Sequence, residues 1–282
     1  MNSHQRLDLR DVTLCAVDTV NPHHAARALD LSMEQCAFGD AILLTHETVP
    51  CRARIVPIER IRSLEAYSSF MLRELASHIS TPWVLVVQWD GYVVNSSSWS
   101  DSFREYDYIG ARWPGAEANR CVGNGGFSLR SARLLQALAN KQFDVPPDGI
   151  EDVLICDTWR TALETDHGIR FAPGDVADRF SYEYGKPSGA TFGFHAMINM
   201  WRHVDDVALV NIIRSLDIHT LASRSNMYCL KVYWDNQKWT CVQALYERYR
   251  QHGSGQDIAA GLMRSGMDEE SASRYVAMCE SL

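Results

Sequence analysis

The sequence WVLVVQWDGYVVN, residues 83–95, limits the class of fold that the chain can adopt. Its first six residues, Trp83 to Gln88, form the most hydrophobic strand-like run of the chain. A continuous apolar run of this length is typical of a strand buried on both faces, as in a parallel sheet covered by helices. Asp90 and Gly91 follow as a turn signal. We therefore expect a central strand that ends in polar side chains.

The residues before this stretch alternate between strand-like and helix-like patterns. Apolar, β-rich runs predict strands over Val12–Thr19, Ala41–Thr45 and Arg54–Ile58, and helical spacing predicts helices over Pro22–Cys36 and from Ser63 to Pro82. Pro57 places the third of these strands near an edge of the sheet, because proline cannot donate a hydrogen bond to a neighbour. Alternating strands and helices favour a mostly parallel sheet with helices on both faces.

The residues after this stretch divide into two parts. Strand-like runs at 106–110, 125–130 and 169–173 are interleaved with helices, whereas from about Asp205 onward the pattern is mainly helical. A Gly/Ser break, HGSGQD, separates the last two predicted helices. The expected organisation is an α/β domain over residues 1–204 and a helical appendage over residues 205–282.

Composition narrows the classes of partner and compartment. The 282 residues contain 27 Lys and Arg against 35 Asp and Glu, a net charge of -8, without a basic run, which excludes a nucleic-acid-binding surface. No apolar stretch approaches the 18 residues of a transmembrane helix, and the polar N-terminus lacks the apolar core of a signal peptide. The eight scattered cysteines favour core thiols in a reducing compartment. We expect a cytoplasmic protein, free or at the inner face of a membrane.

Polar residues stand at the ends of three predicted strands. They are Asp18 and Thr19 after the first strand, Thr45 at the end of the second, and Gln88 and Asp90 after the hydrophobic strand. Ligands of open parallel sheets bind at the carboxyl ends of the strands. These residues are therefore candidates for ligand binding, although each alone is equally consistent with a strand cap or a turn.

A glycine-rich segment, VGNGGFSLRS, spans residues 122–131. Glycines around Asn124, including Gly125 and Gly126, imply a sharp bend or a close approach of the backbone to a ligand. The spacing matches neither a Walker loop nor a dinucleotide-binding fingerprint. A binding loop and a simple hairpin turn both remain open.

Two acidic residues, Glu151 and Asp152, start a predicted helix within PPDGIEDVLIC. They can stabilise the helix by interacting with its N-terminal dipole. A carboxylate in this position can also act as a general base that accepts a proton from a hydroxyl group.

One histidine, His195, lies in the apolar and glycine-rich segment TFGFHAM. It can be a buried core residue, or it can supply a nitrogen ligand beside the oxygen ligand of Asp90. That mixture of ligands suits Mn or a similar divalent ion.

Taken in order, LVVQWDGYVVN, YDYIGARW, VGNGGFSLRS, IEDVLIC, GIRFAP and FGFH resemble a family of bacterial and fungal GT-A-like glycosyltransferase domains that has long been catalogued as a domain of unknown function. The resemblance covers about residues 10–200. It implies a GT-A core in which a DxD motif ends a central strand and binds a metal and the diphosphate of a sugar nucleotide. Here the motif reads Gln88-Trp89-Asp90, so that Gln88 replaces the first carboxylate.

The resemblance also implies roles for the other residues. Asp152 resembles the base of an inverting transfer, Glu151 resembles its neighbour that orients the acceptor, and His195 with Asp90 resembles a site for Mn or Mg. The implied donor is a nucleotide sugar, and the implied acceptor is a glycan, a lipid-linked sugar or another hydroxyl compound. The residues expected to bind the donor are Asp18, Thr19, Thr45, Gln88, Asp90, Asn124, Gly125 and Gly126.

Two alternatives stay open at this point. The first is a metal-dependent hydrolase that uses Asp18, Asp90, Asp152 and His195, although AVDTV lacks the second acid of the DxDxT motif of haloacid-dehalogenase-like phosphatases. The second is a catalytically inactive protein that binds sugar nucleotides, which the missing acid at Gln88 favours.

Overall fold

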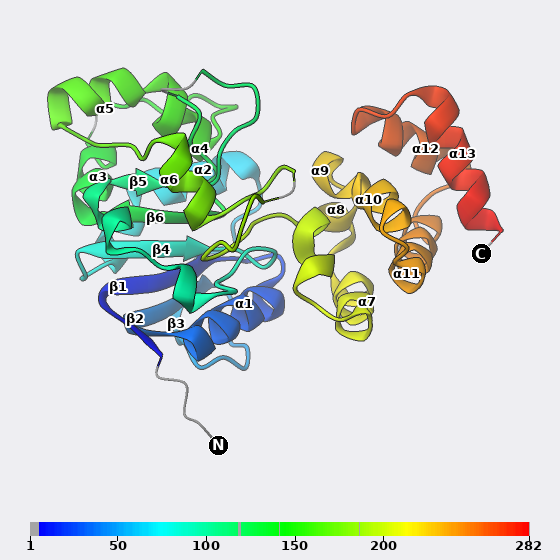
Figure 1. Ribbon diagram of the computed structural model, residues 1–282, viewed down its shortest axis with the longest axis horizontal. Helices are drawn as coiled ribbons and strands as arrows, with labels where there is room; N and C mark the ends of the chain where they lie inside the picture. The colour runs from blue at the N-terminus through cyan, green and yellow to red at the C-terminus, as the bar shows by residue number, and fades with distance from the viewer. Residues whose placement is uncertain (1–5, 118–119, 141, 186, 282) are drawn as a thin grey trace. The chain divides into compact units, whose positions relative to one another are not determined.

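The computed structural model describes residues 6–117, 120–140, 142–185 and 187–281. The chain forms two compact units, Met1–His195 and Ala196–Leu282, each of which is described by itself (Figure 1). The domain boundary after residue 204 stays a prediction. In the described ranges, no helix combines the length and the apolarity that crossing a membrane requires.

The first unit is built on a mixed sheet. In the described chain the sheet has six strands in the order β3-β2-β1-β4-β6-β5. The first four run parallel, and β6 runs antiparallel to both β4 and β5. The predicted α/β class with a mostly parallel sheet flanked by helices is confirmed, and β3 is an edge strand as Pro57 indicates. The strands are β1 (Leu7–Val17), β2 (Cys36–Thr45), β3 (Arg54–Pro57), β4 (Trp83–Val87), β5 (Tyr108–Ile109) and β6 (Phe127–Ser131).

Helices of the first unit start where the sequence provides caps. Proline occupies the first turn of α1 after Asn21. The Ser63 hydroxyl accepts a hydrogen bond from Ala66 N at the start of α2, and the Ser131 hydroxyl accepts one from Leu134 N at the start of α3. The helices are α1 (Pro22–Gln35), α2 (Leu64–Arg73), α3 (Ala132–Leu138), α4 (Glu151–Val153), α5 (Arg160–His167) and α6 (Gly174–Phe180).

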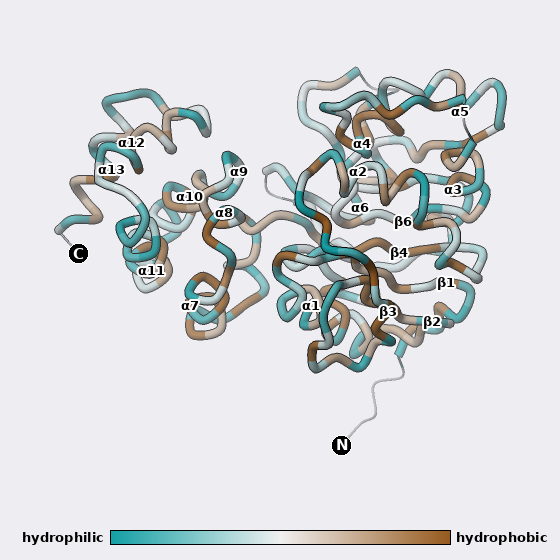
Figure 2. The backbone as a smooth tube through the Cα atoms, turned by 180° about the vertical axis from the view of Figure 1, so that it is seen from behind, coloured by the Kyte–Doolittle hydropathy of each residue, from teal (hydrophilic) through white to brown (hydrophobic). Residues whose placement is uncertain are grey.

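The core lies on both faces of the sheet, because side chains of a strand alternate between faces. Along β1, Leu14 and Ala16 pack with residues of α1 and α6. Cys15 and Val17 pack on the other face with residues of α2 and α3. Figure 2 shows hydrophobic colour along the central strands, as expected of strands covered on both sides.

The reversal of β6 determines what lies at the carboxyl end of β4. Val87, the last residue of β4, pairs with Phe127, the first residue of β6. The glycine-rich loop before β6 therefore reaches the same edge of the sheet as the polar residues after β4. Periodicity predicts a strand over residues 125–130 but contains no information on its direction.

The strand predicted over residues 169–173 is reduced to a single bridge between Phe171 and Tyr108. Pro173 has no N–H group to extend the pairing, and it directly precedes α6. The pairing therefore ends after one residue.

The second unit is helical. The HGSGQD break lies between α11 and α12, where Ser254 and Asp257 form a capping box. A further helix, α13, follows, so this break does not separate the last two helices as predicted. Gly266, with φ +106°, makes that later turn. The helices are α7 (Asp206–Ser215), α8 (Ile218–Leu221), α9 (Arg224–Met227), α10 (Cys229–Asp235), α11 (Trp239–Arg250), α12 (Gly255–Arg264) and α13 (Glu269–Glu280).

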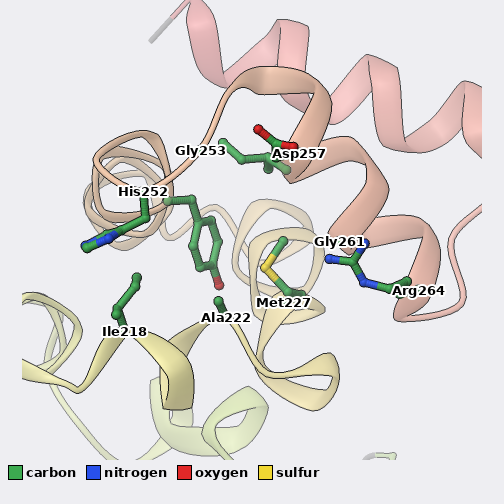
Figure 3. A pocket seen from close by; sticks show the side chains of 10 residues that line it. Ile218, Ala222, Met227, His252, Gly253, Asp257, Gly261 and Arg264 are labelled. Carbon is green, nitrogen blue, oxygen red and sulfur yellow. The ribbon is translucent and has the colours of Figure 1, made fainter.

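A small cavity of about 150 Å³ lies among the helices of this second unit. Its lining includes apolar side chains, such as Ile218 and Met227, and a basic one, Arg264 (Figure 3). None of the residues predicted to form the site belongs to this unit.

Candidate functional site

Predicted site residues meet at the carboxyl edge of the parallel strands. Asp18 follows β1, Thr45 ends β2, and Asp90 follows β4, the strand next to β1. Burial raises the pKa of Asp18, and the nearby Asp90 raises it further, so the two carboxylates lie within electrostatic range of each other. The reversed strand β6 adds the glycine-rich loop to this edge.

Three of the predicted donor-binding residues at this edge differ in their contacts. Asp18 Oδ1 accepts hydrogen bonds from the backbone N–H groups of Val20 (2.7 Å) and Asn21 (2.6 Å), which fixes the turn into α1. The Thr19 hydroxyl both donates to and accepts from the backbone of Ile61, at 3.0 Å each. Thr45 is buried, and its hydroxyl has no hydrogen-bond partner among the described residues.

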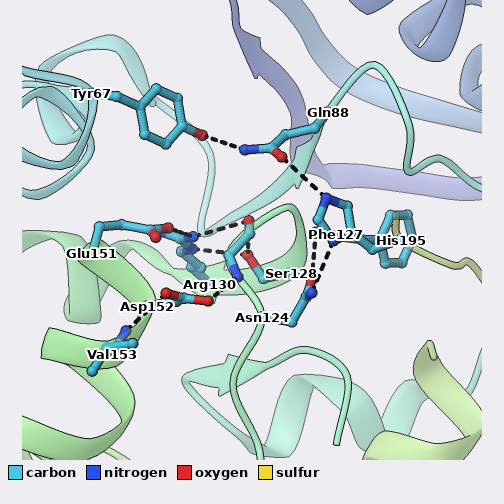
Figure 4. Close-up of polar contacts among 11 residues, drawn as sticks. Tyr67, Gln88, Asn124, Phe127, Ser128, Arg130, Glu151, Asp152, Val153 and His195 are labelled. Atoms are coloured by element: carbon cyan, nitrogen blue, oxygen red, sulfur yellow. Dashed lines mark hydrogen bonds and ion pairs between the residues drawn. The ribbon is translucent and has the colours of Figure 1, made fainter. Parts of the chain in front are cut away.

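Gln88, Asp90 and His195 form one side of the site, which we call the β4 side. Figure 4 shows Gln88 and His195. The Gln88 amide nitrogen donates to the Tyr67 hydroxyl at 2.9 Å, and its oxygen lies 3.1 Å from His195 Nε2. An amide can donate to the first group and accept from the second at the same time. Gln88 thus links Tyr67 to His195 through one uncharged side chain.

His195 lies between two carboxylates. Its Nε2 is 3.4 Å from Asp90 Oδ1, and its Nδ1 is 3.2 Å from Glu183 Oε1 and 2.9 Å from Asn124 Nδ2. Burial by itself would lower the pKa of His195, but Asp90 and Glu183 outweigh burial and raise it to about 10. The two carboxylates therefore favour the protonated ring of His195, whereas Asn124 Nδ2, itself a donor, can donate to Nδ1 only in the neutral ring.

This arrangement does not fit the predicted Mn or Mg site at Asp90 and His195. A metal-binding imidazole is neutral and uses a ring-nitrogen lone pair. Both ring nitrogens of His195 already have polar partners. Within the described ranges, no group of three or more His, Cys, Asp or Glu side chains is placed to hold a metal ion. The side chains around His195 therefore do not support the assignment of a metal site.

The glycine-rich loop lies between the two sides of the site. A Cβ atom on Gly126 would lie 2.1 Å from His195 Nε2, and one on Gly125 would lie 2.2 Å from Glu151 Oε1. Asn124 adopts φ +68°, and its side-chain oxygen accepts from Phe127 N at 3.1 Å. The glycines therefore allow two site side chains to approach the backbone, which the hairpin interpretation alone does not explain.

Arg130, Glu151 and Asp152 form the other side, which we call the β6 side (Figure 4). Arg130 is fully buried, and its guanidinium forms an ion pair with Glu151, which is 5% exposed. The guanidinium also donates to the Ser128 hydroxyl at 3.0 Å and to Gly125 O at 3.2 Å. A buried charge needs such a partner and further hydrogen bonds.

Asp152 is held by two backbone groups and is partly exposed. Its Oδ2 accepts from Gly125 N at 3.0 Å, and its Oδ1 accepts from Val153 N at 2.9 Å. Burial, followed by the charge of Glu151, raises the pKa of Asp152 to about 6, although the Gly125 N–H and Arg130 oppose this rise. A carboxylate with this pKa is ionised at neutral pH and is a stronger base than an ordinary aspartate.

Sequence reasoning missed two charged residues of the site. Arg130 could have been found, because a charged residue within the apolar strand run FSLR needs a buried partner. Glu183 follows α6 in a loop and has no spacing that relates it to His195. Its place at the site results from backbone pairing, since His195 N donates to Tyr182 O at 2.9 Å.

Comparisons with known proteins place this geometry in context. No curated protein matches the sequence. Among solved structures, a mannosyltransferase from Pyrobaculum calidifontis, in complex with GDP-Man and Mn²⁺, is similar over 99% of this chain and 86% of its own. The two share 9% sequence identity, with a TM-score of 0.42. A family match covers residues 50–195, just over half of the chain, and the protein therefore belongs to the family described as "Protein of unknown function (DUF5672)".

Proposed function

We propose that the protein is a glycosyltransferase that moves a sugar from a nucleotide-sugar donor to an acceptor hydroxyl, with Asp152 as general base. The observation that carries this proposal is the carboxylate of Asp152. It is oriented by Gly125 N, it is partly exposed at the ligand-binding edge of the sheet, and its pKa is raised to about 6. These are the properties that proton removal from a hydroxyl group requires.

In the proposed step, the acceptor oxygen forms a bond to the anomeric carbon of the donor sugar. The bond between that carbon and the diphosphate oxygen breaks, and its electron pair leaves with the nucleoside diphosphate. The hydroxyl proton passes to Asp152. Attack opposite the leaving group inverts the anomeric centre, as the sequence resemblance implies.

The donor belongs at the carboxyl ends of the parallel strands. The convergence of predicted residues from separate strands at this edge supports that placement. The predicted donor-binding set keeps its members, Asp18, Thr19, Thr45, Gln88, Asp90, Asn124, Gly125 and Gly126. No step of the proposal uses Mn or Mg, because the side chains of Asp90 and His195 do not fit a metal as ligands.

Glu151 is better suited to positioning than to contact with the acceptor. Its carboxylate is buried against Arg130, and it packs directly on Gly125. It thereby fixes the loop whose N–H group orients Asp152, and its charge helps to raise the pKa of Asp152. We propose that Glu151 acts through Asp152.

The Asp152→Asn variant tests the proposal, because it keeps the shape of the side chain and removes its basicity. Sugar nucleotides based on UDP, GDP and dTDP are first screened by thermal shift, and turnover of the one that binds is then measured. We expect turnover to fall by about a hundred- to ten-thousand-fold, with donor affinity unchanged. Asp157→Asn is a matched control, because Asp157 is exposed and its carboxylate pairs with Arg120, away from the predicted site residues.

Other outcomes identify the alternatives. Retention of more than about a tenth of the turnover in Asp152→Asn, against the usual contribution of a general base, contradicts the role of Asp152. Donor binding without any turnover of the unmodified protein indicates an inactive sugar-nucleotide-binding protein. Phosphate release from simple monoesters indicates a hydrolase.

A further inference from the structure

A cavity of about 340 Å³ lies in the first unit, outside the predicted site residues. It is lined by Arg112, which follows β5, by Asp178 on α6, and by the segment after α6 that includes Ser181, Glu183 and Tyr184. Small-molecule sites usually have volumes of roughly 300–1,000 Å³. This cavity is at the lower end of that range, which suits a single small ring rather than a long chain.

The cavity is connected to the proposed active site through its own lining residues. Glu183 lines the cavity and also contacts His195 Nδ1 at 3.2 Å. Burial raises the pKa of Tyr184, and the charges of Glu183 and Asp152 raise it further, so the Tyr184 hydroxyl is within electrostatic range of the proposed base. A ligand in the cavity would therefore contact Glu183, which in turn contacts His195 on the β4 side.

The polar walls of the cavity are held in place before any ligand binds. Arg112 forms two hydrogen bonds with Asp178, from Nε at 2.9 Å and from Nη2 at 2.7 Å. Its guanidinium packs against Gly174, where a Cβ atom would lie 2.3 Å from it. A guanidinium has five N–H groups, so some remain to donate to a ligand.

Two further groups on the walls are suited to a carbohydrate. Ser181 is 1% exposed, and its hydroxyl has no hydrogen-bond partner among the residues that the structure describes. Such a buried hydroxyl is costly unless something bonds to it. Tyr184 is 55% exposed and provides an aromatic face with a polar tip, on which the C–H face of a pyranose can pack.

We propose that this cavity binds an uncharged hexopyranose unit of a saccharide. Hydroxyl groups of the sugar bond to Arg112, Ser181 and Glu183, and its C–H face packs on Tyr184. An uncharged ligand is favoured because Asp178 already neutralises Arg112 and Glu183 adds a negative charge. Identifying this saccharide as the acceptor rests on the proposed function.

The position of the cavity favours the acceptor over the donor. Its walls come from the part of the chain around β5 and α6, whereas the donor residues follow β1, β2 and β4 or lie in the glycine-rich loop before β6. Asp152 accepts a hydrogen bond from the backbone of that loop, at Gly125 N. For this saccharide to be the acceptor, one of its hydroxyl groups has to come within hydrogen-bond reach of Asp152, as a general base requires.

The test uses the full chain and the methyl glycosides of glucose, galactose and mannose as probes, in the absence of any donor. Saturation-transfer NMR detects binding, and titration gives the dissociation constant. We expect at least one methyl hexoside to bind, Tyr184→Ala to weaken this binding by about two- to tenfold, and Tyr184→Phe to retain it. Methyl glucuronide, which carries a negative charge, is expected to bind more weakly than methyl glucoside.

The Ser181→Ala variant gives a second, independent measurement if Tyr184→Ala fails to fold. It removes a hydroxyl without a protein partner, so it should weaken hexoside binding while leaving the urea midpoint of unfolding unchanged. Absence of binding by all three hexosides overturns the inference, as does binding that neither substitution weakens. If the protein binds hexosides but transfers no sugar, the saccharide site inferred here still holds. The proposed glycosyltransferase function is then wrong.

Discussion

The β4 side and the β6 side of the site place their charged groups in contrasting ways. On the β4 side, the ring of His195 lies between Asp90 and Glu183, and Gln88 also contacts it. On the β6 side, a buried arginine pairs with one acid only, and the adjacent Asp152 remains partly exposed. Both carboxylates of the β4 side thus contact the imidazole, whereas the β6 side keeps one carboxylate that forms no ion pair and is partly exposed.

Glu151 and Asp152 show how much this difference depends on position. They are adjacent in sequence, yet Glu151 faces Arg130 and Asp152 accepts from Gly125 N. The environment of Asp152 raises its pKa to about 6. Two adjacent acids at a helix start therefore perform different tasks, because their side chains diverge into different surroundings.

The largest effect is expected when the buried ion pair of the β6 side is broken. Arg130→Met leaves Glu151 buried without its cation, which typically lowers the free energy of unfolding by about 3–5 kcal/mol. Urea unfolding followed by tryptophan fluorescence measures this loss. The control is Arg54→Met, because Arg54 forms an exposed pair with Asp40, and such pairs contribute about 0–1 kcal/mol.

A second variant determines whether the unpaired charge of Glu151 causes the loss of stability in Arg130→Met. Adding Glu151→Gln to Arg130→Met removes the unpaired carboxylate, so part of the lost stability should return. A double variant that is as unstable as the sum of the two single variants would instead assign the loss to packing.

Much of the parallel part of the sheet follows from local patterns in the sequence. Continuous apolar runs identify β1, β2 and β4, and Pro57 identifies β3 as an edge strand. The carboxyl ends of parallel strands lie along one edge of the sheet, but Asp18 and Asp90 are near each other because β1 and β4 are neighbours, which the apolar runs do not predict.

The rest of the site depends on long-range pairing that periodicity does not encode. The direction of β6 places Asn124 and the following glycines beside β4, and backbone pairing between residues 179–182 and 192–195 brings Glu183 to His195. The metal prediction came from residue types and from the family resemblance. It lacked the contacts of Gln88 and Glu183, which occupy the imidazole nitrogens.

A smaller effect is expected from acid on the β6 side. Asp152 must be ionised to accept a proton, and its pKa is raised from the ordinary 3.8 to about 6. The value of kcat/KM should therefore be constant above about pH 7 and fall about tenfold for each pH unit below 6. Initial rates from pH 4.5 to 8 measure this profile.

Protonation of Asp152 does not unfold the protein, so unfolding through this group cannot produce the same fall in kcat/KM at low pH. A carboxyl group whose pKa is higher in the folded state than in the unfolded state stabilises the fold as pH falls between the two values. Circular dichroism at pH 5 verifies that the protein is folded. An acid limb near pH 4 would show that the base is a carboxylate in an ordinary environment, which contradicts the assignment to Asp152.

The smallest effect, on donor affinity, is expected when divalent ions are removed from the solution. His195 is engaged at both ring nitrogens, so Mn or Mg has to displace Gln88 or Glu183 from the imidazole before His195 can bind it. We expect the same donor affinity in EDTA and in excess Mn²⁺, measured by calorimetry with the sugar nucleotide found in the thermal-shift screen. His195→Ala is the matched variant, because it removes the imidazole and leaves Asp90 in place. Donor affinity that rises with Mn²⁺ in the unmodified protein but not in His195→Ala would restore the metal site that the sequence predicted, and would show that the β4 side rearranges when the donor binds.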